Sequence, residues 1–388
     1  MNFLCFMLAP VFLAVTCLLF AVYAVIMLRY RRWFLRLQPF QLPAGHIPIT
    51  FFSVIIPARN EEDAIVACLR SVLDQQYPSH LLEVIVVDDH STDNTAELVK
   101  QWQQLYPNLQ LVSLSEHVKG QPLNSYKKKA IETGIGQARG EWIVTTDADC
   151  TTPPGWLAHY DGWIQRESPV FVAAPVVIRG NGSVLDSFQV LDFMALQGIT
   201  AAAVSAGSHS MCNGANLAYR KNVFYEVDGF RRIDHIASGD DMLLMNRIRE
   251  RYPQQVTALF TQDVVVSTQP MDSWMAFLNQ RVRWASKADK LDDRTVLPVL
   301  LVVYFLNLTL LLLPWLAFAD PIVLIWWLGL LVGKTVVEST FAGPVARFFG
   351  IRLLWWFPLL QFLHIPYTVL AGWLGKFGSY RWKGRKVV

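Results

Sequence analysis

The sequence predicts an α/β protein with a mainly parallel sheet, helices on both faces of that sheet, and transmembrane helices at both ends of the chain. Of its 388 residues, 53% are hydrophobic and only 17% are charged, whereas a soluble domain usually carries about 25% charged residues. The apolar excess is confined to the two ends. The middle alternates continuous apolar runs with helical patterns, which is typical of a parallel sheet covered on both faces. Disorder, a secreted disulfide scaffold and a simple cytosolic enzyme are excluded.

The first apolar segment carries no charge over residues 3–28, which is long enough to cross a hydrocarbon core of about 30 Å. A cleaved signal peptide would begin with positive charge and have a shorter apolar core. Here the positive charges follow the segment, at Arg29, Arg31, Arg32 and Arg36. We therefore expect a transmembrane anchor over residues 1–30, with its basic flank and the domain that follows in the cytoplasm.

The α/β domain is expected over residues 48–270, with strands near residues 51–57, 82–87, 109–114 and 142–146. In parallel sheets, ligands bind at the carboxyl ends of the strands. Asp88 and Asp89 follow the second strand, and Asp147 and Asp149 follow the fourth. We expect these four carboxylates to surround one crevice. Neither a GxGxxG nor a GxxxxGK[ST] motif is present, so dinucleotide-binding and P-loop folds lack their main support.

The Asp147-Ala148-Asp149 motif suits a hard divalent cation. Strand alternation or a turn brings both carboxylates onto one ion, and Mg²⁺ and Mn²⁺ take oxygen ligands that they share with phosphate groups. A solvated turn is the alternative for this motif alone. Helix capping is the alternative for the acidic pairs at residues 88–89 and 240–241.

Three further apolar segments, at residues 296–319, 321–341 and 353–374, predict transmembrane or re-entrant helices over residues 296–375. Lys334 and Glu338 are four residues apart and are expected to pair. Three full crossings would place the basic tail, residues 376–388, outside. We expect a cytoplasmic tail, as a re-entrant third segment allows. His364, in that segment, is either a functional residue or a neutral, hydrogen-bonded imidazole.

Two other stretches are expected at the membrane surface. Residues 184–206 are apolar but interrupted by Asp186, Gln189, Asp192 and Gln197, which indicates an amphipathic helix against the domain or the bilayer. Residues 271–295 form an expected interfacial helix. It places Gln280, Arg283 and Trp284 within one turn, and a basic amphipathic face is the alternative explanation.

Composition excludes some partners and sites. A formal net charge of +3 is too small to indicate nucleic acid as a partner, and the sequence contains no signal for an oligomeric state. The five cysteines are scattered without metal-ligand spacing, so we expect free thiols, with Cys150 a small buried filler.

Seven blocks, taken in this order, resemble the membrane-attached family 2 glycosyltransferases with a GT-A fold. They are SVIIPARNEE (53–62), VIVVDDHSTDNT (84–95), KKKAI (127–131), IVTTDADC (143–150), GANLAYRK (214–221), SGDDMLLMNRI (238–248) and QRVRWASK (280–287). The resemblance covers about residues 50–290, with compatible flanking membrane helices. The tail motif at residues 382–385 is similar to an ending found in bacterial lipid glycosyltransferases.

This resemblance implies that a sugar is transferred, with inversion, from a nucleotide diphosphate-sugar donor. It implies that Mg²⁺ or Mn²⁺ is held by Asp149 with Asp147, and that Asp241 is the general base. Arg283 would bind the diphosphate, and Asp240 would complete the catalytic set. The implied donor-binding residues are Pro57, Ala58, Asn60, Glu61, Asp88, Asp89, Lys128, Asp147, Gln280, Arg283 and Trp284. Lys127 is the alternative to Lys128, because the run of three lysines allows either.

Two departures from the family pattern bear on the product. Many processive members have TED where this chain has Gly239-Asp240-Asp241, and processive synthases usually commit more membrane helices to a channel. We therefore expect a non-processive enzyme in the bacterial inner membrane, with its catalytic domain in the cytoplasm and a membrane-lipid acceptor. A processive polysaccharide synthase and an inactive membrane scaffold that retains the fold are the alternatives.

Overall fold

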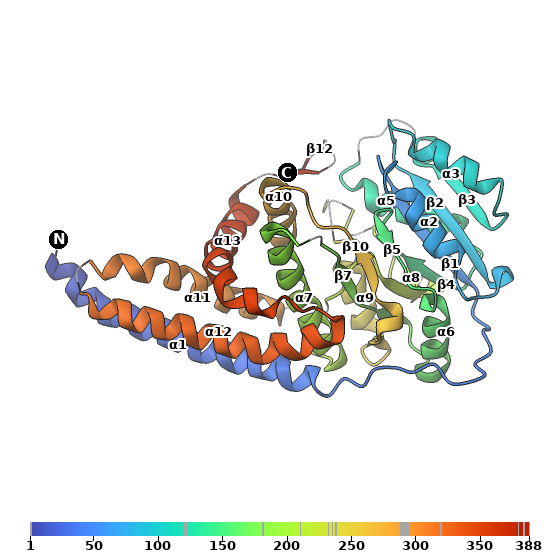
Figure 1. Ribbon diagram of the computed structural model, residues 1–388. Helices are drawn as coiled ribbons and strands as arrows, with labels where there is room; N and C mark the ends of the chain where they lie inside the picture. The colour runs from blue at the N-terminus through green and yellow to red at the C-terminus, as the bar shows by residue number, and fades with distance from the viewer. Residues whose placement is uncertain are drawn as a thin grey trace.

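The computed structural model describes residues 2–118, 123–180, 182–209, 211–231, 233–234, 236, 239–287, 295–318, 320–378, 380–382 and 385–387. It consists of an α/β domain and an elongated arm of apolar helices, with the amino terminus at the tip of the arm (Figure 1). Both parts of the predicted fold class are therefore confirmed.

The central sheet has seven strands in the order β3-β2-β1-β4-β8-β6-β9. Its first four strands are mutually parallel, β8 is antiparallel to both of its neighbours, and β9 is parallel to β6. The strands are β1 (Phe52–Ala58), β2 (Leu82–Asp88), β3 (Leu109–Ser113), β4 (Trp142–Thr145), β6 (Phe171–Ala173), β8 (Leu217–Arg220) and β9 (Val256–Ala258). A smaller sheet pairs β5 (Cys150–Thr151), β10 (Val266–Thr268) and β7 (Val176–Ile178).

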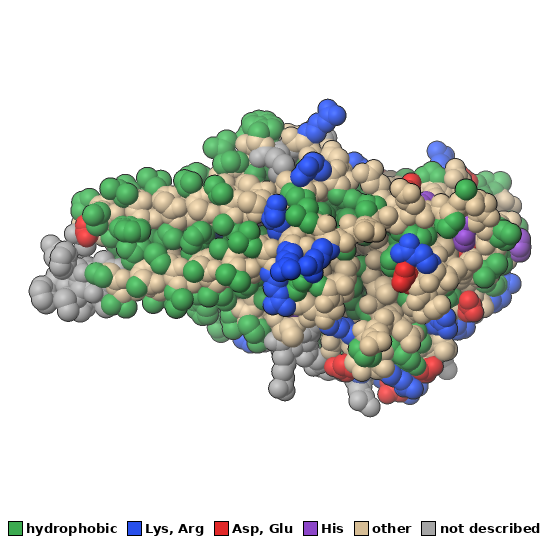
Figure 2. All heavy atoms as spheres, turned by 90° about the horizontal axis from the view of Figure 1, so that it is seen from below, with side chains coloured by type: hydrophobic (Ala, Val, Ile, Leu, Met, Phe, Trp, Pro, Cys, Tyr) green, Lys and Arg blue, Asp and Glu red, His purple; other side chains and the backbone are tan. Residues whose placement is uncertain are grey.

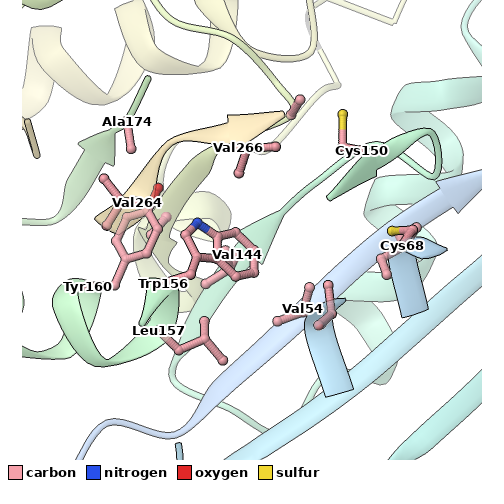
Figure 3. Packing of buried hydrophobic residues seen from close by; sticks show 14 of the residues in the cluster. Val54, Cys68, Val144, Cys150, Trp156, Leu157, Tyr160, Ala174, Val264 and Val266 are labelled. Carbon is pink, nitrogen blue, oxygen red and sulfur yellow. The ribbon is translucent and has the colours of Figure 1, made fainter. Parts of the chain in front are cut away.

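Helices cover both faces of the sheet because successive residues of each strand point to opposite sides. On one face, Val54 packs in a cluster with Cys68 and Trp156 (Figure 3). On the other face, Ile55 packs with Ile131. The helices of the domain are α2 (Ile65–Leu73), α3 (Thr95–Gln103), α4 (Leu114–His117), α5 (Tyr126–Gln137), α6 (Trp156–Glu167), α8 (Lys221–Glu226), α9 (Met242–Arg251) and α10 (Trp274–Ala285), with short 3₁₀ turns at Ser79–Leu81 and Gln262–Val264.

Five helices are long and apolar enough to cross a membrane, by length and composition. They are α1 (Asn2–Phe34), α7 (Val184–Ser205), α11 (Val296–Leu316), α12 (Ile322–Phe349) and α13 (Phe357–Phe377). Helix α1 packs along α11 and α12 to form the arm (Figure 1). Hydrophobic side chains cover the arm, and Lys and Arg side chains gather where it joins the domain (Figure 2). These helices indicate that the protein associates with a membrane.

Helix α7 is wedged between the arm and the sheets. It packs against α1, α12 and β7, and a side chain on Gly198 would come within 2.6 Å of Val345, so glycine permits the close approach of α7 to α12. The predicted helix at residues 184–206 is therefore present, but it does not lie on a surface with a hydrated polar face. Gln189 and Gln197 are buried and bind the backbone of Met271 and Val176.

The last helix runs differently from the arm. A 3₁₀ turn at Leu353–Trp356 precedes α13, which packs against α10 and α11 and rises steeply relative to α1 and α12 (Figure 1). The strands β11 (Tyr380–Trp382) and β12 (Arg385–Val387) form a hairpin beside α10. The hairpin thus lies on the domain side of α13, and the predicted re-entrant course of residues 353–374 stays a prediction. Two residues of the tail motif, Lys383 and Gly384, lie outside the described residues.

A buried polar network joins three of the apolar helices. The predicted pair forms, with Lys334 Nζ 2.7 Å from Glu338 Oε1. Gln361 of α13 accepts from Lys334 at 2.7 Å and donates to Glu338 Oε2 at 2.6 Å. Tyr23 of α1 donates its hydroxyl hydrogen bond to Glu338. This network fixes the register of α1, α12 and α13 in an otherwise apolar environment.

We predict that Lys334→Met lowers the free energy of unfolding by about 3–5 kcal/mol, because it leaves the Glu338 carboxylate buried without its counter-ion. The double variant Lys334→Met/Glu338→Gln should recover most of this loss. Arg347→Met, at an exposed position in the last turn of α12, is the control and should change stability by less than about 0.5 kcal/mol. Unfolding of the three variants in a rising concentration of a denaturing detergent measures their free energies of unfolding. Equal stability of the single and double variants would contradict the prediction.

Candidate functional site

The loops that follow β1 and β2 are tied together at the carboxyl edge of the sheet. Ala58 pairs with Asp88 in the parallel register, and the Asp89 backbone N–H donates to Ala58 O at 2.8 Å. Asn60 has a positive φ of 49° and accepts the Thr92 backbone N–H on its Oδ1 at 2.8 Å. Glu61 N–H donates to Thr95 Oγ1 at 2.8 Å. The predicted residues of both loops therefore lie side by side, in one cross-bonded unit.

Asp88 and Asp89 are both buried at this edge. Asp88 Oδ1 accepts the backbone N–H of Ser91 at 3.3 Å, and Asp89 Oδ1 lies 2.9 Å from His90 Nδ1. Bonds within the loop therefore account for part of what these carboxylates do, whereas the N-cap position of α3 is occupied by Asn94. The Pro57–Ala58 end of β1 lies directly beside them.

A second acidic group forms where three other segments meet. Lys127, in the first turn of α5, places its Nζ 2.6 Å from Asp147 Oδ1 and 3.5 Å from Asp240 Oδ2. Asp147 follows β4, and Asp240 precedes α9. Gly214 borders the same place, because a side chain there would come within 3.1 Å of Asp240 Oδ2 and 3.6 Å of Lys127 Nζ. A glycine at this position leaves the acidic group uncovered.

The charges of this group support one another. Burial opposes the charged form of Lys127, but the Asp147 and Asp240 carboxylates outweigh it and raise the pKa of Lys127 above its usual value. Burial likewise opposes the charged form of Asp240, but Lys127 and Lys287 outweigh it and lower the pKa of Asp240. Lys127 is thus held as a cation and Asp240 as an anion.

Asp241 is bonded to two different segments. Its Oδ1 accepts the Met242 N–H at 2.7 Å and so caps α9, as the capping alternative predicts. Its Oδ2 accepts the Gly214 N–H at 3.2 Å. The second bond connects Asp241 to the turn before β8. A carboxylate that only caps α9 would not need this bond. Two backbone amides therefore fix the orientation of this carboxylate beside Asp240.

The DAD motif occupies a turn between β4 and β5, with Asp147 and Asp149 both partly exposed. Among the described residues, no three His, Cys, Asp or Glu side chains are grouped to hold a metal ion. Two carboxylate donors one residue apart nevertheless fit Mg²⁺ or Mn²⁺, since these ions keep water and phosphate oxygens as their remaining ligands. The donor chemistry of the turn is therefore suitable for a metal that a phosphate-bearing ligand shares.

Of the run of three lysines, the structure brings Lys127 and not Lys128 to the carboxylates. Lys128 is buried, and its Nζ donates to Ile233 O at 2.5 Å and to Ile236 O at 2.7 Å. Burial lowers its pKa to about 8. Successive helix residues point about 100° apart, so one lysine faces the acidic group while the next anchors the 233–236 segment. Lys127, the alternative within the run, is therefore the lysine that contacts Asp147 and Asp240, and the assignment of donor binding to Lys128 stays a prediction.

Helix α10 carries Gln280, Arg283 and Trp284, and between them an arginine that sequence reasoning missed. Arg281 is 3% exposed, and its Nη2 lies 2.8 Å from Asp192 Oδ2 of α7. Its guanidinium lies 4.1 Å from the centre of the Trp284 ring, and its Nη1 donates to Gln280 Oε1 at 3.2 Å. The signal in the sequence was a pair of charges in each helix, Asp186 and Asp192 in α7 and Arg281 and Arg283 in α10.

The two cysteines beside the DAD turn are packing residues. Cys68 and Cys150 are buried in the cluster shown in Figure 3. Burial raises the pKa of both thiols, and the nearby Asp149 and Asp147 carboxylates raise it further. Neutral thiols are poor nucleophiles and metal ligands, which agrees with the predicted filler role of Cys150.

Comparison with known sequences identifies two family profiles. The profile described as Glycosyl transferase family 2 matches residues 53–228, and the one described as Glycosyl transferase family group 2 matches residues 142–374, more than half of the chain. The matches include all the segments that meet at the carboxylates.

Three curated relatives illustrate the range of similar proteins. Glycosyltransferase AglE of Haloferax volcanii is 29% identical over 50% of this chain and 60% of its own length. The poly-beta-1,6-N-acetyl-D-glucosamine synthase of Staphylococcus epidermidis is 24% identical over 73% of this chain and 64% of its own. Beta-monoglucosyldiacylglycerol synthase of Nostoc sp. is 29% identical over 32% of this chain and 25% of its own. The chain spans less than two thirds of the length of each.

A solved structure shares the fold over nearly the whole chain. Mannosyltransferase PcManGT of Pyrobaculum calidifontis, in complex with GDP-Man and Mn²⁺, superposes with a TM-score of 0.60 at 21% identity and covers 95% of this chain and 98% of its own. The GT-A architecture expected from the sequence is therefore confirmed.

The three lysines offer a matched test of the geometry. We predict that Lys128→Met lowers the free energy of unfolding by about 1–3 kcal/mol, because two buried carbonyls lose their donor. Lys129→Met, which removes a part-exposed pair with Glu132, should change it by less than about 1 kcal/mol. Chemical unfolding of the purified variants measures both changes. A larger loss for Lys129→Met than for Lys128→Met would contradict the assignment.

Proposed function

This chain belongs to glycosyl transferase family 2, and from that premise we propose that it transfers a sugar from a nucleotide diphosphate donor to a membrane-lipid acceptor, once per acceptor and with inversion. One observation carries the proposal. Lys127, Asp147 and Asp240 meet at the carboxyl edge of the sheet, in a domain that α7 joins to apolar helices. A charged group at this edge is suited to a charged ligand.

The nucleoside of the donor would bind the cross-bonded loops after β1 and β2. Carboxylates accept hydrogen bonds from ribose hydroxyls and from a base N–H, and Asp88 and Asp89 stand beside the loop of residues 57–61. The bonds of Asn60 and Glu61 to the neighbouring loop would hold this surface in shape before the donor arrives.

The diphosphate would lie between the DAD turn and two cations. Asp149 with Asp147 would hold Mg²⁺ or Mn²⁺, which when bound neutralises negative charge on the departing diphosphate. Lys127 and Arg283 would bind the same phosphate oxygens as cations, with Gln280 and Trp284 on the same helical turn as Arg283. The complex of PcManGT with GDP-Man and Mn²⁺ supports this choice of ligand classes.

Asp241 would act as the general base. It would accept the proton of the acceptor hydroxyl as that oxygen attacks the anomeric carbon, from the side opposite the leaving diphosphate. The amides of Met242 and Gly214 would hold the carboxylate in place. Asp240 would keep Lys127 aligned with Asp147.

The membrane arrangement supports a lipid acceptor reached from the cytoplasm. Arg31 and Arg32 end α1, and Arg347 lies in the last turn of α12, all at the domain end of the arm. Positive charge favours the cytoplasmic side, so we place the domain at the cytoplasmic face of a bacterial inner membrane. The name of the Nostoc relative indicates a lipid product and supports the acceptor class.

A processive polysaccharide synthase is the second candidate. The match to a poly-beta-1,6-N-acetyl-D-glucosamine synthase over 73% of this chain favours it. The Gly239-Asp240-Asp241 motif, where many processive members have TED, argues against it.

We predict that Asp149→Ala and Asp241→Asn each abolish sugar transfer, with a loss of about 10²- to 10⁴-fold in kcat for Asp241→Asn. Thermal shift with a panel of GDP- and UDP-sugars and Mn²⁺ separates the two roles. Asp241→Asn should keep the stabilisation by the donor, and Asp149→Ala should lose it. Asp272→Asn, an exposed residue before α10, is the control. Near-normal turnover in both variants would disprove the assignment, and absence of any donor binding would favour the inactive scaffold.

Product size separates single transfer from polymerisation. With excess donor and a bilayer extract as acceptor, we predict one lipid product that carries one added sugar, because the proposed reaction adds one sugar to each acceptor. Mass spectrometry of the extracted products measures this. A ladder of products, each longer by one sugar, would establish the processive alternative.

A further inference from the structure

A second buried polar cluster lies where α7, α10 and α13 meet, and it differs from the network inside the arm. Within the described part of the chain, seven buried side-chain nitrogen and oxygen atoms have no hydrogen-bond partner. Four of them belong to Asp192, Arg281 and His364. In the Lys334–Glu338–Gln361 network the polar groups bind one another. Buried polar atoms are normally satisfied, so each exception needs an explanation.

The contacts within this cluster hold it together without completing it. Arg281 Nη2 and Asp192 Oδ2 are 2.8 Å apart, as an ion pair, but they do not meet at a hydrogen-bonding angle. His364 Nε2 lies 4.0 Å from Asp192 Oδ1. Tyr367 of α13 interacts with Arg281 and lies beside the His364 ring, but Arg281 Nε and His364 Nδ1 have no hydrogen-bond partner among the described residues. The cluster therefore offers donors and acceptors to a further polar group.

The cluster is open to the surface of the protein beside exposed apolar side chains of α13. The His364 side chain is 29% exposed, and its neighbours Phe362 and Leu363 on α13 are 56% and 39% exposed. A ligand entering past His364 would therefore have an apolar part against α13 and a polar part at Arg281. This is the geometry of a lipid with a polar head.

The cluster also adjoins the proposed active site. The Arg281 guanidinium stacks on Trp284, and Trp284 packs on Phe193 at a ring distance of 5.9 Å. Phe193 belongs to the buried cluster that includes Ala148 of the DAD turn. Arg281 is therefore connected through Trp284 and Phe193 to the hydrophobic core of the α/β domain.

We propose that Asp192, Arg281 and His364 bind the neutral, hydroxyl-bearing headgroup of the acceptor lipid. The proposal rests on the function proposed above and names the chemistry of its acceptor. A hydroxyl group donates to a carboxylate and accepts from a guanidinium or imidazole N–H, so it satisfies both kinds of open atom. A phosphate would have to lie against the Asp192 carboxylate, which already neutralises Arg281.

The test uses the full chain in phosphatidylcholine nanodiscs with a photoactivatable diacylglycerol, and maps the labelled peptides. We expect labelling of α13 or α10 that excess dioleoylglycerol suppresses and dioleoyl phosphatidate does not. Labelling spread over the arm without competition would overturn the proposal. Equal or better competition by phosphatidate would overturn the neutral chemistry and assign the cluster to an anionic lipid.

Variants separate a binding site from a structural ion pair. The double variant Asp192→Asn/Arg281→Met removes both charges together and leaves no unpaired ion, and His364→Phe changes a residue outside the ion pair. Both should reduce the competed labelling about tenfold or more, since a buried hydrogen bond is lost. Arg347→Met is the matched control and should label as the parent does. Parent-level labelling in folded variants would reduce the cluster to a structural role; if the double variant does not fold, His364→Phe decides.

Donor binding distinguishes the failure of this inference from the failure of the proposed function. Thermal stabilisation by nucleotide sugars with Mn²⁺ is measured on the same nanodiscs. If the donor stabilises the protein and the cluster is not labelled, this inference alone is wrong. If no nucleotide sugar stabilises it, the proposed function fails, and the labelling pattern still decides whether the cluster binds lipid.

Discussion

The parallel pairing of β1 between β2 and β4 is the constraint on which the rest of the site depends. Ala58 is in register with Asp88 on one side, and Ile55 with Thr145 on the other. Three strands therefore end at one edge, and the loops that leave them begin within a few residues of one another. Side chains alternate between the two faces of a strand, so a shift of the pairing by one residue would move every core residue of that strand to the opposite face. The positions of the acidic residues follow from the packing of the sheet.

Helix α7 connects the sheet to the arm of apolar helices and holds the two in a defined orientation. Its buried Gln197 accepts the Val176 N–H at 3.0 Å, and Gln189 exchanges two bonds with Met271 just before α10. The ends of the arm are tied to the turn after α7, since His209 lies 2.9 Å from Tyr30 Oη and 2.7 Å from Thr295 Oγ1. The arm thus has a fixed relation to the domain through side chains that are polar in an apolar helix. Polar residues that would weaken an isolated span are here the connections between the two parts.

The sequence was sufficient for the architecture and for the segments of the site, because continuous apolar strands, motif order and apolar length are properties of the chain itself. It was not sufficient for side-chain direction. Lys127 and Lys128 are identical in type and adjacent, and only the packing of α5 decides that one meets Asp147 while the other bonds the carbonyl of Ile233. The contact of Asp192 with Arg281 joins residues 89 positions apart by number, and nothing local to either predicts it. The same holds for Gly214, whose role is the space that it leaves beside Asp240.

The two buried polar clusters, Lys334–Glu338–Gln361 and Asp192–Arg281–His364, differ in how many of their polar atoms are hydrogen-bonded within the protein. Inside the arm, Gln361 supplies both an acceptor for Lys334 and a donor for Glu338, so the charges are buried with their partners. At the junction, the Gln280 amide accepts from Arg281, but no amide among the described residues bonds both Arg281 and Asp192. Leaving buried polar atoms open costs stability, and proteins concentrate such costs where a ligand supplies the missing bonds. Four of the seven open atoms in the described part of the chain lie where the domain meets the apolar helices, which is where the proposed lipid acceptor would have to bind.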